Sequence, residues 1–311
     1  MDVQVLHFDT LLAQEVNRSV LNANQPYCLL LFGEIDISED QIDALVRRMK
    51  QGAEIAAIQP KVITDEGVFS KYGGAGGFID ALGYWYVRGT EFQKSQKDEG
   101  QFDNLSDRLS WVSPPVILVR TDAFKAACGL DTTLDKEIAW VDLGIRFQLI
   151  GYSLHWYPEV SIVLKGKGTS LELSGDVLSS GRIHKSGDIL TTGYFRSRLV
   201  VHYFESMVVP KTIMWIILDL LSSLFNLLRF DLDRCRAFAI SAWSTFLHLP
   251  DWLKHRSDLQ RTIVRKRDHL VHQPYCIYWY HHGKLGKTAS NALAIFLVIA
   301  SVFSLTMRDR R

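Results

Sequence analysis

The sequence predicts an α/β protein with a doubly wound, mostly parallel sheet, followed by an α-helical tail. Up to about Pro158, short apolar runs alternate with amphipathic segments at the spacing of β-α-β units. One of these runs, YCLLLF, has the continuous apolar character of a buried parallel strand. From Gly193 onward the chain becomes markedly more hydrophobic, which indicates a second region of different character.

The composition is that of a folded protein. The chain has 311 residues, of which 47% are hydrophobic and 22% charged, which excludes a disordered or low-complexity polypeptide. The formal net charge is +1, so bulk basic charge gives no support for a nucleic-acid partner. The four cysteines are far apart and form no CxxC pair, which argues against a zinc site or a dense disulfide framework.

The first elements follow in the order helix, strand, helix, strand. Residues 11–24 have helical periodicity, and residues 27–32 form the buried strand. The acidic turn GEIDISED comes next, and Ser38 is placed to cap the helix that follows it. Residues 55–58 predict the next strand, which we expect Pro60 to end.

The rest of this region continues the alternation. Residues 71–78 form a Gly-rich segment without the GxxxxGK[ST] order of a phosphate-binding loop, so we interpret it as a flexible connection. A VILV strand and a helix ending at Cys128-Gly129 follow, then a helix over residues 141–149 and a strand over 154–157. Clustered aromatics at positions 84–86 fit a sugar-binding shelf, or the core of a hairpin.

Two apolar segments characterise the tail. Lys211 and Arg229 bracket seventeen mostly apolar residues, a length near the lower limit for a spanning helix and also compatible with a helix lying in the membrane interface. Residues 288–307 carry no charge and predict a transmembrane helix. The basic stretch 254–267 lies between them and fits either a solvated helix face or contact with anionic lipid.

Two carboxylates directly follow the buried strand. Glu34 and Asp36 stand at i and i+2, at the strand end that points into the ligand crevice of an open α/β sheet. Such a pair suits a hard divalent cation that bridges to substrate phosphates. A solvated acidic loop is the alternative interpretation. Asp142 is expected to open a helix, where a carboxylate is favourable without any catalytic role.

Many short motifs follow one another between about Leu11 and Arg198. They are YCLLLFGEIDI, EIAAIQPKV, YGGAGGFIDALGYWYVRGTEF, DEGQFD, WVSPPVILVRTDAFKAACGLD, WVDLGIRF and GYSLHWYPE. Their order resembles inverting family 2 glycosyltransferases of bacterial cell-surface polysaccharide synthesis. The resemblance implies a GT-A type nucleotide-sugar fold, a nucleotide diphosphate donor, Mg²⁺ or Mn²⁺, and a lipid-linked or growing glycan acceptor.

The resemblance assigns roles to individual residues. Glu34 and Asp36 fall on the family's metal-binding acidic pair, with Glu in place of the first acid. Arg120 and Asp131 fall on the acceptor-side segment, and Arg146 on the helix after the catalytic acids. These three residues are therefore expected to bind substrate.

The sequence also departs from the family pattern. The catalytic acidic pair aligns with Ala139-Trp140, and neither side chain can take a proton from an acceptor hydroxyl. Asp142 is the candidate replacement base, with Glu137 as the other nearby acid. Leu164-Lys165 stands where the family has a histidine after the last strand.

The expected organisation is a glycosyltransferase-like domain over 1–192, a helical, basic, membrane-associated region over 193–287 and a transmembrane helix over 288–307. The fold is expected to be incomplete at the N-terminus, lacking about 60 residues or two βα units that hold the nucleotide. Two functions follow from the resemblance: a membrane-associated glycosyltransferase of envelope-glycan synthesis, or an inactive pseudoenzyme that binds or scaffolds. A partner subunit fits either function, and the α/β domain is expected to face the cytoplasm.

Overall fold

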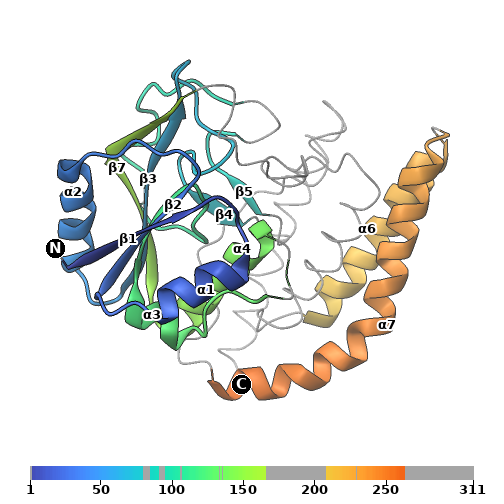
Figure 1. Ribbon diagram of the computed structural model, residues 1–311. Helices are drawn as coiled ribbons and strands as arrows, with labels where there is room; N and C mark the ends of the chain where they lie inside the picture. The colour runs from blue at the N-terminus through green and yellow to red at the C-terminus, as the bar shows by residue number, and fades with distance from the viewer. Residues whose placement is uncertain are drawn as a thin grey trace, which may run out of the picture. The chain divides into compact units, whose positions relative to one another are not determined.

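The computed structural model describes residues 2–79, 85–90, 95–105, 107–132, 134, 136–165, 208–228 and 230–262 (Figure 1). These residues belong to two compact units, one built on a β-sheet and one containing two long helices. The expected domain boundaries at residues 192 and 287, and the predicted transmembrane helix 288–307, lie outside the described residues.

A five-stranded sheet forms the centre of the first unit. Its strands lie in the order β1-β2-β6-β3-β7. β1 pairs parallel with β2, β3 pairs parallel with β7, and β6 lies antiparallel between β2 and β3. Four of the strands therefore run in one direction, and the predicted mostly parallel sheet is confirmed. The strand bounds are β1 Val3–Phe8, β2 Tyr27–Phe32, β3 Ile55–Thr64, β6 Val116–Arg120 and β7 Ser153–Leu164.

Helices cover both faces of this sheet (Figure 1). On one face, Leu45 and Met49 of α2 share an apolar core with Leu29 and Leu31 of β2. Because side chains alternate along a strand, Phe32 faces the other way, where it contacts Trp140 of α4 with ring centroids 5.8 Å apart. The predicted double winding is thus present. The helix bounds are α1 Ala13–Leu21, α2 Glu39–Lys50, α3 Thr121–Ala126 and α4 Lys136–Leu149.

The sheet begins earlier in the chain than the sequence indicated. β1 lies beside β2 in register, with Phe8 opposite Phe32, and α1 connects the two strands. Several of its residues are partly or fully exposed because it is an edge strand, so it lacks the continuous apolar run that marks β2. β1 is therefore a strand that the sequence analysis missed, ahead of the predicted helix α1.

Two prolines do not end their strands, contrary to expectation. β3 continues beyond Pro60 to Thr64, and β7 continues beyond Pro158 to Leu164. Pro60 pairs with Tyr157, whereas the next residue, Lys61, pairs with Ser161, so the ladder shifts register at this point. A proline is tolerated in a strand where a bulge removes the need for its missing N–H donor.

The Gly-rich segment is a packed part of the core and not a flexible connection. A Cβ on Gly77 would lie 2.6 Å from atoms of the Trp111 side chain, which only a glycine avoids. The segment leads into a hairpin of β4 (Gly77–Ile79) and β5 (Trp85–Val87). Trp85 and Tyr86 are both buried, which confirms the hairpin interpretation of the aromatic cluster for these two residues.

The second unit contains two packed helices, α6 (Val208–Leu228) and α7 (Leu232–Thr262). α6 includes the apolar segment that Lys211 and Arg229 bracket in the sequence. In the part of the chain that the structure describes, no helix combines the length and the apolar character needed to cross a membrane.

Candidate functional site

The parallel strands place the predicted acidic pair at one edge of the sheet. Glu34 and Asp36 follow the carboxyl end of β2, and both are exposed. Lys165 directly follows the carboxyl end of β7, and its Nζ donates a hydrogen bond to Asp36 Oδ2 at 3.0 Å. Open α/β sheets bind ligands at this edge. The pair therefore stands at the strand end where the sequence predicted it. The Lys165 ammonium lies beside it, a contact that the sequence did not reveal.

The turn that carries the two acids is fixed at both ends. Gly33 has φ +80°, a value glycine adopts readily, and its N–H donates to Phe8 O at 2.9 Å. At the other end Ser38 and Gln41 form a reciprocal capping box that starts α2. Gln41 Nε2 also donates to Ser161 O of β7 at 2.9 Å. The acidic turn is thus attached to β1, α2 and β7.

The acidic pair is chemically suited to the divalent cation implied by the resemblance. Carboxylate oxygens are the ligands that Mg²⁺ and Mn²⁺ accept, and the Lys165 ammonium shows that positive charge is accommodated at Asp36. Among the residues that the structure describes, no group of three or more His, Cys, Asp and Glu could hold a metal ion. By the resemblance, Glu34 and Asp36 are the residues that would hold the cation, which would neutralise charge on a diphosphate.

The first turn of α4 lies at the same edge. This helix precedes β7 and packs along it, and its Trp140 meets Phe32, the last residue of β2. Ala139 and Trp140, which replace the expected catalytic acids, are fully enclosed in the core. Their positions are therefore used for packing against the sheet.

Glu137 lies one helical turn before Trp140. The residue is half-buried, but its Oε1 is shielded from solvent and has no hydrogen-bond partner among the described residues. Burial raises the pKa of this carboxyl to about 8. An acid with these properties exchanges a proton near neutral pH, as a general base must.

Asp142 occupies a different environment from the one expected. α4 begins at Lys136 and not at residue 141, so Asp142 stands inside the helix, where it is only 2% exposed. Arg146 Nε donates to Asp142 Oδ2 at 2.7 Å, and Arg146 Nη1 donates to Ala127 O in the turn after α3. This geometry favours a structural ion pair that attaches α4 to that turn. Arg146, which was predicted to bind substrate, is part of this ion pair.

Arg120 lies at the opposite edge of the sheet. β6 runs antiparallel, so its last residue, Arg120, pairs with Tyr27, the first residue of β2. The guanidinium donates to three carbonyl oxygens at the end of α2, in the α2–β3 connection and at the start of β3, at 2.8 to 3.0 Å. The structure therefore does not bring Arg120 together with the acidic pair, and its contacts are structural.

Asp131 is half-buried and follows a turn that is attached to α1. The Asn17 amide forms two hydrogen bonds with the backbone of Leu130, at 2.7 and 2.8 Å. Sequence reasoning missed Asn17, because a single polar residue on an amphipathic helix carries no signal of a long-range partner. Asp131 remains a predicted substrate-binding residue.

Lys61 is another residue whose role the sequence did not reveal. Lys61 stands in β3 with only 6% of its surface exposed, and its Nζ lies 3.1 Å from Asp98 Oδ2 and 2.7 Å from Asp103 Oδ1. Desolvation lowers the pKa of Lys61, but hydrogen bonds and charge from the two aspartates outweigh it, so the pKa lies above its ordinary value. Lys61 therefore stays charged and attaches the 98–103 loop to the sheet.

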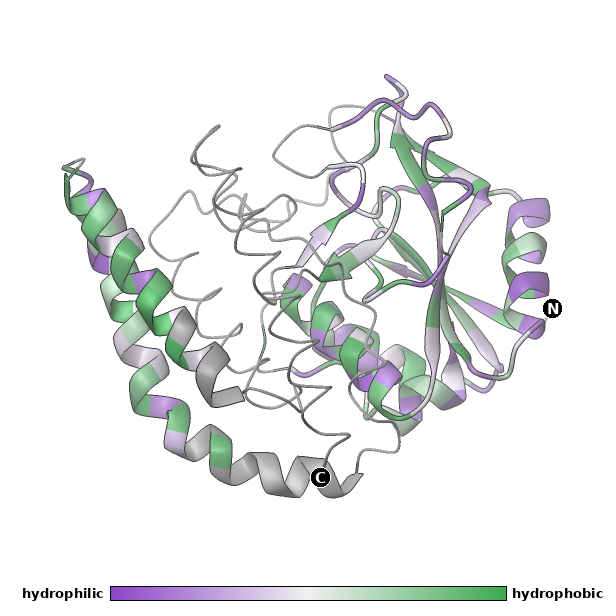
Figure 2. Ribbon diagram, turned by 180° about the vertical axis from the view of Figure 1, so that it is seen from behind, coloured by the Kyte–Doolittle hydropathy of each residue, from purple (hydrophilic) through white to green (hydrophobic). Residues whose placement is uncertain are grey.

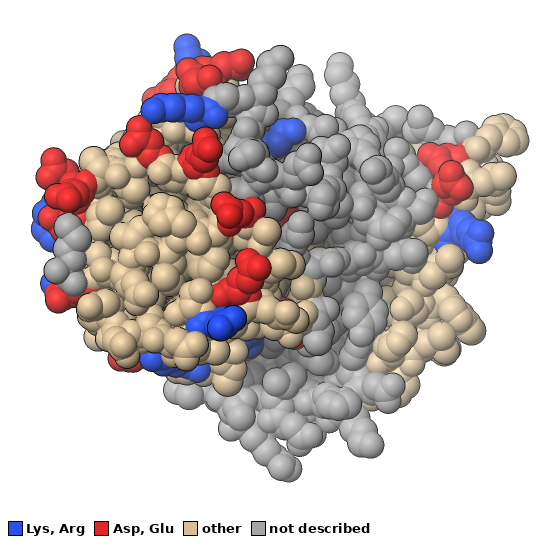
Figure 3. Space-filling view, viewed as in Figure 1, with Lys and Arg blue, Asp and Glu red and all other residues tan. Residues whose placement is uncertain are grey.

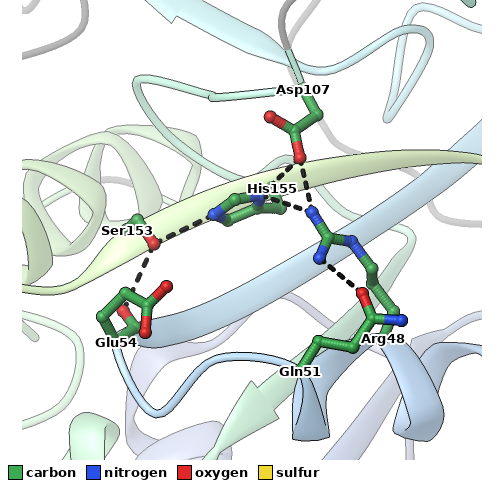
Figure 4. A network of polar contacts seen from close by, with 6 residues as sticks. All are labelled: Arg48, Gln51, Glu54, Asp107, Ser153 and His155. Atoms are coloured by element: carbon green, nitrogen blue, oxygen red, sulfur yellow. Dashed lines mark hydrogen bonds and ion pairs between the residues drawn. The ribbon is translucent and has the colours of Figure 1, made fainter.

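A polar network crosses the amino end of β7 (Figure 4). His155 lies between Ser153 and Asp107, with Nε2 3.0 Å from Ser153 Oγ and Nδ1 2.6 Å from Asp107 Oδ2. Arg48 Nη2 donates to the same Asp107 oxygen at 2.6 Å. Ser153 is 5% exposed, and its N–H and hydroxyl both donate to Glu54 O. The set Ser153, His155 and Asp107 therefore links neighbouring elements, and its serine is not accessible as a nucleophile.

Comparison with known proteins identifies no family. No protein-family model matches the sequence, and no curated protein sequence matches it. Solved structures that match the chain include the crystal structure of GalNAc-T7 with UDP, GalNAc and Mn²⁺, with a TM-score of 0.41 and 12% identity over 64% of this chain and 35% of that chain. Another is the mannosyltransferase PcManGT from Pyrobaculum calidifontis in complex with GDP-Man and Mn²⁺, with a TM-score of 0.30 and 10% identity over 94% of this chain and 66% of that chain.

The chain spans about one third of the length of the first of these structures and about two thirds of the second. Both TM-scores are low, and function is therefore inferred from the residues of this chain.

Proposed function

We propose that this protein is a glycosyltransferase-like enzyme that moves a sugar from a nucleotide diphosphate donor to a lipid-linked or polysaccharide acceptor in envelope-glycan synthesis. One observation carries the proposal: the acidic pair with Lys165 and the base-like Glu137 belong to the same edge of the sheet. The sequence motifs that resemble family 2 glycosyltransferases support it.

The chemistry assigns one role to each group. The Glu137 carboxylate takes the proton of an acceptor hydroxyl, whose oxygen then forms a bond to the anomeric carbon of the donor. The bond from that carbon to the diphosphate breaks, with inversion, and the electron pair leaves with the diphosphate. Lys165 supplies positive charge beside the leaving group, and a divalent cation held by Glu34 and Asp36 would add to it.

Calorimetric titration with UDP and GDP in the presence of Mn²⁺ tests the donor site. We expect binding that Glu34→Ala and Asp36→Ala each weaken about tenfold or more, because each variant removes an oxygen ligand of the cation. Asp40→Ala is the matched control, since Asp40 is an exposed acid in the first turn of α2. If neither nucleotide binds to the wild-type protein, the enzyme proposal is wrong.

A pseudoenzyme that binds or scaffolds is the second candidate function. The observation in its favour is the burial of Ala139 and Trp140, which leaves the expected catalytic positions without an acid. Nucleotide binding without sugar transfer or donor hydrolysis, over a range of acceptors and pH, would favour it over the enzyme. A partner subunit would then supply the chemistry.

We place the α/β unit on the cytoplasmic side of a membrane, because activated sugars are made in the cytoplasm. Protease added to inside-out membrane vesicles should then digest this unit. Protection of the unit in such vesicles would contradict the placement.

A further inference from the structure

The buried face of α6, in the second unit, is mainly polar. Its buried residues recur every three or four positions, which places them on one face of the helix; among the described side chains, five are polar (Thr212, Asp219, Ser222, Ser223 and Asn226) and two are apolar (Trp215 and Leu218). Two hydrogen bonds show that this face meets α7. Ser241 Oγ donates to Asp219 Oδ2 at 2.9 Å, and Ser223 Oγ donates to Cys235 O at 2.8 Å.

The buried side of α7 consists mainly of small residues. Ala237, Ser241, Ala242 and Thr245 are all buried, together with the larger Phe238. Small side chains allow the two helix backbones to approach closely. The contact between α6 and α7 therefore includes hydrogen bonds and small side chains beside the larger Phe238, whereas two helices of a water-soluble protein meet mainly through apolar side chains.

The outward sides of both helices carry large apolar side chains. Each of these residues is at least 41% exposed: Ile213, Ile217, Leu220, Leu221, Leu224, Phe225, Leu227 and Leu228 on α6, and Ile240, Trp243, Phe246 and Leu247 on α7. At about 100° per residue, the positions on α6 cover an arc of roughly 160°. Figure 2 shows hydrophobic residues along both helices, and in Figure 3 most of their visible described surface is uncharged.

This arrangement reverses the polarity that water imposes on a helix pair. Water would place serine, asparagine and aspartate outside and leucine between the helices. A lipid environment favours the opposite arrangement, because small and polar residues then hold the helices together while apolar side chains contact acyl chains. A second copy of the chain would cover only one side of the helix pair. Because both helices carry exposed apolar arcs, lipid covers this surface more completely than a second copy would.

We propose that the hairpin formed by α6 and the first half of α7 is embedded in the apolar layer of a lipid bilayer. The basic stretch 254–267 of the sequence follows the apolar part of α7 and complements anionic headgroups. The embedded element is a hairpin and not a single spanning helix. This inference does not depend on the sugar-transfer chemistry of the first unit.

Photolabelling in vesicles tests the proposal on the full chain. The vesicles contain phosphatidylcholine, phosphatidylglycerol and a phospholipid with a diazirine on its acyl chain, and labelled residues are located by mass spectrometry. We expect label on outward residues such as Leu224 and Trp243, and at least tenfold less on Ser222 and Ser241. Because each labelled residue is identified individually, labelling of any other membrane segment of the chain does not affect the result for α6 and α7.

A matched pair of double variants provides the control. Leu220→Lys with Leu224→Lys should reduce labelling of residues 213–247 at least tenfold, because a bilayer disfavours charge. Leu21→Lys with Leu105→Lys changes two exposed leucines of the first unit and should leave that labelling unchanged; Leu105 and Leu224 are each 53% exposed. The proposal would be overturned if residues 213–247 of the wild-type protein carried no label. It would also be overturned if light scattering showed a dimer that shields these residues from lipid.

Discussion

Glu137 combines burial with freedom from a strong partner. Among the described residues, its Oε1 has no hydrogen-bond donor, whereas the Asp142 carboxylate on the same helix is bound by Arg146. A general base must be able to release and regain a proton at the working pH, and burial places the pKa of Glu137 at about 8. Burial thus distinguishes two acids that the sequence left as alternatives.

Glu137→Gln should abolish sugar transfer and leave nucleotide binding intact. We expect a loss of about a hundredfold or more, the usual contribution of a general base. In the wild-type protein the transfer rate should rise with pH through about 8, since only the carboxylate accepts the proton. Asp142→Asn is the comparison: if this variant alone loses transfer, Asp142 is the base and the assignment to Glu137 is wrong.

The same carboxyl makes a prediction about stability. Its pKa rises from 4.5 in the unfolded chain to about 8 in the folded protein, so the folded state binds the proton more tightly. The free energy of unfolding should therefore decrease as pH rises from 4.5 to about 8. Glu137→Gln removes this decrease, which chemical denaturation at several pH values would detect as a flatter profile than that of the wild type.

Lys165 competes with any cation for Asp36. The ion pair is exposed on both sides, and such pairs contribute little to stability, so a divalent cation can displace the ammonium. Lys165→Met should therefore increase the affinity for Mn²⁺ several-fold, as measured by the electron paramagnetic resonance signal of free Mn²⁺. Lys97→Met, a change of another exposed lysine, should leave the affinity unchanged. Equal affinities in all three proteins would show that Lys165 does not compete.

At the scale of elements, α2 is attached to the sheet from both of its ends. Its first turn contacts β7 through Gln41, and its last turn contacts Asp107 and His155 through Arg48. The apolar face of the helix packs between these two attachments. This arrangement fixes the direction of α2, and with it the position of the acidic turn that precedes the helix.

Asp107→Asn should destabilise the protein by about 1 kcal/mol, because it weakens charged hydrogen bonds that are partly exposed to solvent. Burial raises the pKa of Asp107, but His155 and Arg48 outweigh it, so the pKa lies below its ordinary value of 3.8. The stabilisation by the ionised Asp107 carboxylate is therefore present above pH 3.8 and is lost as the pH falls through the lower pKa of the folded state. Thermal unfolding at neutral and acid pH would measure both effects.

Nucleotide binding provides the control for this variant. Asp107 contacts the amino end of β7, whereas the acidic pair follows the carboxyl end of β2. Asp107→Asn should therefore leave nucleotide affinity unchanged. A change in affinity at a temperature where the variant is fully folded would contradict the separation of the two sites.

At the scale of the whole molecule, the two units differ in what they bury. The first encloses apolar side chains of the sheet and helices, as a protein in water does. In the second, the described helices α6 and α7 bury serine, threonine and asparagine beside Trp215, Leu218 and Phe238, and expose leucine and phenylalanine. The balanced composition of the chain therefore averages two regions with different patterns of burial.

The sequence by itself determined the class of the fold, the strand β2, the capped start of α2 and the acidic pair at the strand end. These features are local, because an apolar run, a serine cap and adjacent carboxylates can be recognised within a few residues. The tertiary structure alone revealed the surroundings of Arg120, Asp142, Glu137 and Lys165. Arg120 and Lys165 have partners far away in the chain, the ion pair of Asp142 is attached to Ala127 through Arg146, and the pKa of Glu137 depends on burial, none of which is encoded in local spacing.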